Sequence, residues 1–192
     1  MRIARYLVIA VLAGAAATPA LATDGHFLHG VGAINSSMGG AGVAAPRSLL
    51  GAFYLNPAGL SLFRGTRMEF GFEMFLADRT VSSSFGPLSG STTSTSEYTP
   101  VPAMGLSMQL NDRVTVGLGG LGVGGFGVDY AASSPTASPN PILLPEPNGF
   151  GAVYSNYSLL KITPAIAWRA SERLSVGAAI NVDWASLGVR RS

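Results

Sequence analysis

The chain has 192 residues, of which 47% are hydrophobic and only 11% are charged, with 25 glycines and no cysteine. A soluble domain is typically about a quarter charged, and the lack of cysteine excludes disulfide staples and thiolate chemistry. After the N-terminus no window offers the roughly 18 uncharged apolar residues of a membrane helix. An apolar, glycine-rich chain without long apolar runs favours a protein that crosses a membrane with β-strands.

The N-terminus is typical of a secretory signal peptide. Arg2 and Arg5 precede an apolar run over residues 7–17, and a small-residue cleavage pattern follows at residues 20–22. We therefore predict removal of residues 1–22 and favour this over an uncleaved anchor, because the apolar run is short. Removing two arginines lowers the 12 basic residues to ten, equal to the 10 acidic ones. The mature segment is neutral, so the basic pI gives no argument for nucleic-acid binding.

Residues 23–65 are rich in glycine, alanine and serine and have no sustained period. A short helical turn at residues 35–37 is the most that the sequence supports. Such a segment cannot form a core of its own, so it is packed inside another part of the protein or is disordered. It ends at Asn56-Pro57-Ala58-Gly59-Leu60, where Pro57 fixes φ and Gly59 can adopt a left-handed conformation, and we predict a turn there.

From Thr66 onward the pattern has period two, which predicts strands. The predicted strands cover residues 66–76, 103–110, 114–130, 160–169 and 174–184. Residues 111–113 and 171–173 are tight turns. Residues 82–97 are predicted as a Ser/Thr-rich loop and residues 131–156 as a proline-rich loop.

The alternation assigns side chains to two faces. One face is apolar and includes Phe70, Phe72, Ile180 and Trp184. The other carries charged residues that we predict to line the lumen of a barrel, namely Arg67, Glu69, Glu73, Lys161 and Asp183. Glu69 and Glu73 resemble an acid/base pair, but we favour lumen charges paired with Arg67 or with the segment inside.

The third strand is irregular. Val114, Val116 and Leu118 keep one phase, Leu121 and Val123 take the opposite phase after Gly119-Gly120, and Phe126 and Val128 return to the first phase after Gly124-Gly125. A slip of one residue sends every side chain to the other face, so a bulge or kink is predicted among these glycines. The alternative is that the glycines make room for a packed neighbour.

Connections that alternate between long and short are typical of outer-membrane barrels, which have long extracellular loops and short periplasmic turns. Five strands cannot close, since such barrels begin at about eight strands. We therefore expect this chain to be the front part of a longer all-β protein in the outer membrane of a Gram-negative bacterium.

The signal peptide, the segment Met38-Gly39-Gly40-Ala41-Gly42-Val43, and Asn56-Pro57-Ala58-Gly59-Leu60 before a barrel together resemble the FadL-type outer-membrane transporters. The segments Ile162-Thr163-Pro164-Ala165 and Leu174-Ser175-Val176-Gly177 are also similar to that family. The resemblance implies an antiparallel transmembrane β-barrel of fourteen strands, of which about five are present here. It further implies that residues 23–65 are a hatch plugging the lumen. The proline-rich loop would correspond to the extracellular loop where the family first captures substrate.

The function implied is passive uptake of long-chain fatty acids or other hydrophobic compounds, such as aromatic hydrocarbons, with exit sideways into membrane lipid. Hatch rearrangement would involve Asn56, Pro57, Ala58 and Gly59, and the lateral opening would lie at Gly119, Gly120, Gly124 and Gly125. An adhesive or structural barrel and a water-filled porin remain alternatives. We predict no enzyme activity and no cofactor or metal. His26 and His29 are spaced like a metal pair but have no carboxylate or cysteine partners nearby.

Overall fold

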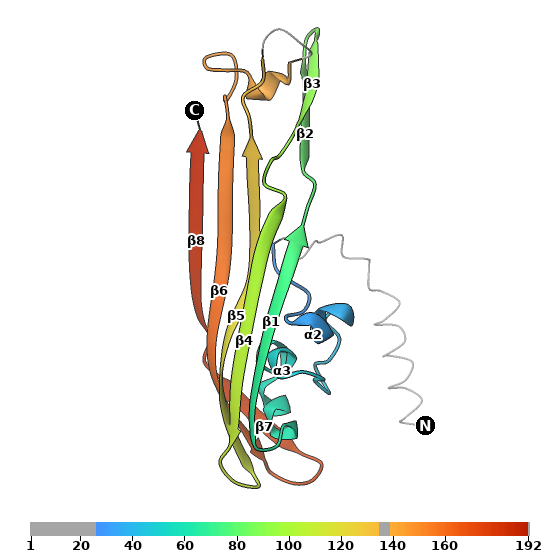
Figure 1. Ribbon diagram of the computed structural model, residues 1–192, viewed down its shortest axis with the longest axis vertical. Coiled ribbons are helices and arrows are strands. Elements are labelled where there is room, and N and C mark those ends of the chain that lie inside the picture. The colour runs from blue at the N-terminus through green and yellow to red at the C-terminus, as the bar shows by residue number, and fades with distance from the viewer. Residues whose placement is uncertain (1–25, 135–138, 192) are drawn as a thin grey trace, which may run out of the picture.

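A tall antiparallel sheet dominates the computed structural model, which describes residues 26–134 and 139–191 (Figure 1). Its strands are β1 (Thr66–Leu76), β4 (Tyr98–Gln109), β5 (Val114–Tyr130), β6 (Val153–Arg169), β7 (Ser175–Ala179) and β8 (Val182–Arg191). The order is β1-β4-β5-β6, with β7 and β8 both paired to β6. We call this sheet the wall. The five predicted crossing strands are thus present in the predicted order, as an open sheet. The predicted signal peptide lies outside the described residues.

The fifth predicted strand is interrupted, which the alternation did not predict. β7 pairs with residues 165–169 of β6 and β8 with residues 153–162, and the register is the same on both sides of the break. Between them Ile180 donates its N–H to the carbonyl oxygen of Pro164 at 3.1 Å. Pro164 has no N–H to donate to Ile180 in exchange, so one hydrogen bond of the β-ladder is missing at this position.

The two faces of the wall follow the predicted alternation. On the outer face the four apolar residues assigned to lipid, Phe70, Phe72, Ile180 and Trp184, are 66–73% exposed. Inward-facing Ala103, Leu121, Ala165 and Ala167 are buried. No helix in the described ranges is long and apolar enough to cross a membrane.

Residues 26–65, the described part of the predicted hatch, lie on the inner face of the wall (Figure 1). They contain α2 (Ala33–Ser37), α3 (Leu49–Leu55) and the 3-10 helix η1 (Pro57–Leu62). Helix α3 begins after Ser48, whose Oγ accepts from the N–H of Gly51 at 3.0 Å. Its apolar residues form one core with the wall, as expected for a segment that cannot form a core alone. The hatch supplies Val31, Leu49, Leu50, Ala52, Phe53 and Leu60 to this core.

The predicted loop over residues 82–97 is wrong in part, because a second hairpin forms there. Strands β2 (Thr80–Phe85) and β3 (Leu88–Thr93) pair around a turn in which Gly86 has a φ of 56°. Ser and Thr hid the alternation of this hairpin from the sequence analysis. The hairpin and residues 131–134 and 139–152 stand at one end of the wall, which we call the loop end, and residues 111–113 and 171–173 form the turn end (Figure 1).

Candidate functional site

The wall is not continuous between β4 and β5. Their pairing runs from Gln109 opposite Thr115 only to Ala103 opposite Leu121. Beyond that point β4 continues along β1 as far as Tyr98, and β5 continues along β6 as far as Tyr130. Residues 98–102 of β4 and 122–130 of β5 therefore border a stretch without β4–β5 pairing, which we call the split.

Two prolines explain why the pairing stops. The N–H of Gln109 bonds to Gly65 on the β1 side, and the N–H of Leu110 bonds to Val114 on the β5 side. Successive residues of a strand direct their N–H groups to opposite neighbours, so even-numbered residues of β4 face β5. Pro100 and Pro102 consequently present nitrogens without hydrogen to β5. The two prolines are visible in the sequence, but the neighbour that each nitrogen faces follows only from the register.

On the β5 side the predicted irregularity is a bulge. Gly122 pairs with Leu160 and Gly124 with Leu159, so the register shifts by one and Val123 has no partner in β6. The bulge lies inside the predicted range, next to Gly124, whereas Gly119 and Gly120 are regularly paired on both sides. The predicted phase of Phe126 and Val128 is also wrong. After the bulge Phe126 pairs with Tyr157 on the hatch face, so both side chains lie inside instead of facing lipid.

The glycines of β5 have two different roles in packing. A Cβ on Gly119 would lie 2.9 Å from Thr163 Cγ2 and 3.0 Å from Phe53 Cγ, so this glycine makes room for the Phe53 ring. A Cβ on Gly124 would lie 2.5 Å from the carbonyl oxygen of His26, so this glycine lets the hatch backbone approach. Gly119 therefore fits the alternative considered from the sequence, in which a glycine makes room for a packed neighbour.

Residues 26–28, which we call the hatch strand, occupy the edge of β5 that β4 leaves free. Leu28 donates its N–H to the carbonyl oxygen of Val123 at 2.9 Å, and Gly125 donates to that of His26 at 2.8 Å. Phe27 and Gly124 form an antiparallel bridge between these bonds. Backbone groups need such partners where lipid replaces water.

Nearer the loop end a second segment covers the same edge. Asp129 donates its N–H to Ser94 Oγ at 2.9 Å and accepts from the N–H of Thr95 at 2.9 Å. The edge of β5 along the split is therefore covered by two short segments, of which the hatch strand belongs to the hatch.

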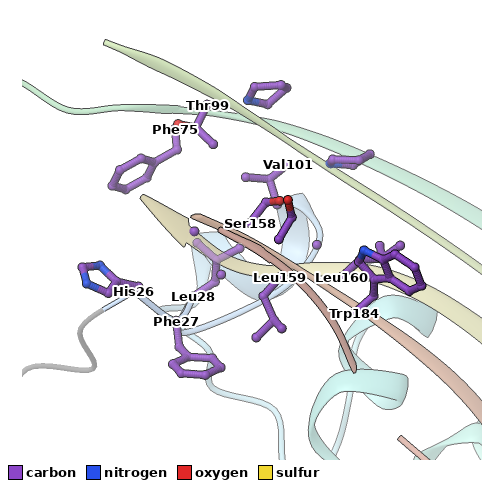
Figure 2. A pocket seen from close by; sticks show the side chains of 16 residues that line it. His26, Phe27, Leu28, Phe75, Thr99, Val101, Ser158, Leu159, Leu160 and Trp184 are labelled. Carbon is purple, nitrogen blue, oxygen red and sulfur yellow. The ribbon is translucent and has the colours of Figure 1, made fainter. Parts of the chain in front are cut away.

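A cavity of about 370 Å³ lies at the split, within the size range of small-molecule sites. Figure 2 shows His26, Phe27 and Leu28 of the hatch strand on one side of it and Leu160 and Trp184 on the other. Leu160 and Trp184 are exposed on the outer face of the wall. Phe75, Val101, Pro100, Pro102 and Leu159 are further apolar lining residues, and among the described residues that line the cavity there is no Asp, Glu, Lys or Arg. The cavity thus reaches from the hatch to the outer surface.

The predicted hatch motif lies at the turn end and forms a 3-10 helix instead of a turn. Asn56 Oδ1 accepts from the N–H of Ala58 at 3.1 Å, and Pro57 is in the first turn of η1. Gly59 does not have a positive φ. A Cβ there would lie 2.3 Å from Pro46 Cγ, so close packing is the reason for glycine.

Helix η1 is held firmly to the wall. A Cβ on Gly177 of β7 would lie 2.2 Å from the backbone nitrogen of Ala58. Ser61 Oγ donates to Ser175 Oγ at 2.9 Å, and the Arg169 guanidinium donates to the carbonyl oxygen of Ser61. This end of the hatch is therefore fixed by contacts with two strands.

Two of the five predicted lumen charges bind the hatch directly. Glu69 Oε2 accepts from the N–H of Leu49 at the start of α3 at 2.6 Å, and Glu73 Oε2 accepts from Ser36 Oγ at 2.9 Å. A carboxylate at a helix start is favourable because it accepts from a free N–H. Glu69 and Glu73 thus contact the hatch, which was one of the two partners considered for them.

The other three predicted lumen charges, Arg67, Lys161 and Asp183, have different neighbours. Arg67 Nε donates to the carbonyl oxygen of Arg64. Lys161 borders a hollow with His29 and Tyr54, and Asp183 lies opposite Lys161 in the β6–β8 register. In the described ranges no group of three or more His, Cys, Asp or Glu could hold a metal ion.

A wall of strands with an apolar, exposed outer face and a packed segment against its inner face defines a class, the plugged outer-membrane β-barrels. The chain belongs to the family described as "Outer membrane protein transport protein (OMPP1/FadL/TodX)", which matches residues 12–191. Neither a curated protein nor a solved structure matches the chain at a significant level. The family consists of β-barrel transporters of hydrophobic compounds in the outer membrane, so this is a multi-pass outer-membrane protein and the resemblance noted from the sequence is confirmed.

Proposed function

We propose that the protein takes up hydrophobic compounds, in the range from aromatic hydrocarbons to long-chain fatty acids, and releases them sideways through the split between β4 and β5. The observation that carries this proposal is that the hatch strand pairs with β5 where β4 does not. A ligand that displaces the hatch strand reaches the bilayer through the wall without crossing water.

The small number of backbone bonds between the hatch strand and β5 supports its role as the gate, because the further bond of Leu28, from the Tyr54 hydroxyl to its carbonyl oxygen, stays within the hatch. Two backbone hydrogen bonds join it to β5, and each contributes about 0.5–1.5 kcal/mol. The Phe53 ring and η1 fix the other end of the hatch in closely packed contacts. The hatch strand can therefore leave while the rest of the hatch stays in place.

The loop end offers a site for first capture. A hollow of about 800 Å³ lies between the β2–β3 hairpin and residues 141–150, lined by Phe85, Leu88, Ile142, Leu144 and Phe150 among others. Buried Asn140 holds the two parts together, because its Nδ2 donates to the Val81 carbonyl at 2.9 Å and its Oδ1 accepts from Ser83 Oγ. By the rule that long loops are extracellular, this hollow faces the medium.

The gate is tested by a matched pair of proline substitutions in the full-length protein. Leu28→Pro removes the N–H that bonds to Val123, whereas the N–H of Phe27, one residue earlier, faces away from β5 in the strand alternation. In cells that lack their own transporter, Leu28→Pro should raise the initial uptake rate of labelled fatty acid or aromatic hydrocarbon, and Phe27→Pro should leave it near wild type. Equal rates for Leu28→Pro and Phe27→Pro at equal protein levels would contradict the proposed gate. Uptake no faster than in cells without the protein would contradict transport itself.

A further inference from the structure

Three aromatic rings stand in a row at the split, and one of them belongs to the hatch strand. The His26 ring lies 4.1 Å from the Phe126 ring between centroids, with the planes at 37°. Phe126 in turn stacks on Tyr157 at 5.5 Å and 26°. Phe126 and Tyr157 are neighbours across β5 and β6, and Tyr157 packs against the core. The wall thus supplies a fixed pair of rings, and the hatch covers that pair with a third ring.

Departure of the hatch strand would uncover one face of Phe126. His26 bonds to β5 through its carbonyl oxygen, next to Phe126, at Gly125. When this bond opens, the imidazole ring leaves with the backbone that carries it. Gly124 and Gly125, which directly precede Phe126, line the cavity, so the uncovered ring face would lie beside the route through the wall. An incoming aromatic ring can replace the stacking contact that His26 gives up.

The charges near the split favour an uncharged ligand. In the part of the chain that the structure describes, the polar side chains that line the cavity are His26, Thr99, Ser158 and Ser186, and no Lys or Arg is among these lining residues. A carboxylate that enters such a place loses water and gains no ionic partner. Lys161 is next to Leu160 in the chain, but it borders the hollow on the inner side and lies opposite Asp183. The cation nearest in sequence to the cavity lining therefore already has an acidic neighbour.

We infer that the lateral opening binds an uncharged compound with an aromatic ring, which stacks on the face of Phe126 that His26 covers in the closed state. This inference rests on the proposed lateral uptake and narrows its substrate class. Phe126 is then a residue that determines specificity, and His26 occupies the place of the ligand ring until the hatch strand leaves.

The test uses three probes of matched shape with the full-length protein in the outer membrane. Ethylbenzene carries the ring, ethylcyclohexane has the same outline without π electrons, and 4-ethylbenzoate adds a carboxylate to the ring. Initial uptake by wild type should be fastest for ethylbenzene, and 4-ethylbenzoate should stay at the level of cells without the protein. The variants are Phe126→Leu, which removes the ring, and Phe126→Tyr, which keeps it.

The decisive quantity is the ratio of ethylbenzene to ethylcyclohexane uptake, because Phe126→Leu also loosens His26 and can raise both rates. Phe126→Leu should lower this ratio about three- to ten-fold, and Phe126→Tyr should restore it. An unchanged ratio in Phe126→Leu, or uptake of 4-ethylbenzoate as fast as ethylbenzene, would overturn the inference while leaving lateral uptake standing. Absence of protein-dependent uptake for all three probes would instead contradict the proposed function.

Discussion

The two halves of β5 differ in what lies beside them. From Thr115 to Leu121 the strand is paired with β4, and Gly117 and Gly119 make room for the Phe53 ring of the hatch. From Gly122 to Tyr130 it has no β4 partner, and the hatch meets it through backbone hydrogen bonds. The same hatch is therefore attached by close packing at one half and by a short strand at the other.

This difference indicates which part of the hatch can move. Separation of the packed half exposes apolar surface and leaves a space that solvent or another side chain must fill. Separation of the hatch strand breaks two hydrogen bonds that water or a returning strand can replace. The hatch therefore has a fixed part, which packs against the first half of β5, and a releasable part, the hatch strand, which pairs with the second half.

The largest effect is expected in the packed half. Phe53 is buried and fits against Gly105, Gly117 and Gly119, so Phe53→Ala should destabilise hatch docking by about 3–5 kcal/mol. Phe27 in the hatch strand is 56% exposed, and Phe27→Ala should change docking by less than about 1 kcal/mol. Hydrogen exchange of the α3 amides in the full-length protein measures both. Similar protection of α3 in the two variants would contradict the division into halves.

The wall that carries both halves is tested by charge substitutions. Ile180 is on the outer face, so Ile180→Lys should destabilise the barrel by about 2–4 kcal/mol near mid-bilayer. Its neighbour Asn181 is predicted to face the lumen, and Asn181→Lys should have a much smaller effect. Unfolding of the two full-length variants in lipid vesicles compares them. Equal losses of stability would rule out this register.

Deletion of Val123 tests what the bulge contributes to the split. Without it Gly122 and Gly124 become consecutive opposite Leu160 and Leu159, so β5 would pair regularly with β6. We expect a folded barrel with most hydrophobic uptake lost, measured as uptake per assembled barrel. Wild-type uptake by a folded deletion variant would argue against a role for the bulge.

The smallest effect is expected from Pro57→Ala at the fixed end. The substitution should cost no more than about 1 kcal/mol through the unfolded chain, and the barrel should assemble. If the hatch motif sets the position of the hatch, uptake will change. Pro87→Ala in the β2–β3 turn is the matched control. Uptake per barrel equal to wild type in Pro57→Ala would remove the functional role of the motif.

The sequence predicted the wall well, because the crossing strands other than β5 alternate between an apolar and a polar face. A bulge was predicted among the glycines at residues 119–125, where glycines and a phase change coincide, and it lies between Gly122 and Gly124. The hairpin β2–β3 was missed because Ser and Thr give little contrast between its faces. Helix α3 was missed because its seven residues, Leu49–Leu55, are stabilised by wall contacts that lie far away in the sequence.

The candidate site could be predicted only in part. On the β5 side the glycines were visible in the sequence. The β4 side depends on which neighbouring strand each proline nitrogen faces, and that requires knowledge of the register between the strands. The hatch strand could not be predicted at all, since residues 26–28 become a strand only through pairing with Gly124. The stack of His26 on Phe126 likewise follows from the bulge, which turns Phe126 to the inside.

A reversible staple across the split tests the central claim most directly. A Cβ on Gly122 would lie 2.9 Å from Val101 Cγ1, which suits a disulfide between cysteines at these positions, and the chain has no other cysteine. The control staple joins Met104 and Gly120, which already pair in the closed part of the same border. We predict that oxidation stops hydrophobic uptake by the full-length V101C/G122C variant, that reduction restores it, and that the M104C/G120C variant transports in both states. Continued uptake by the oxidised V101C/G122C variant would contradict a route through the split.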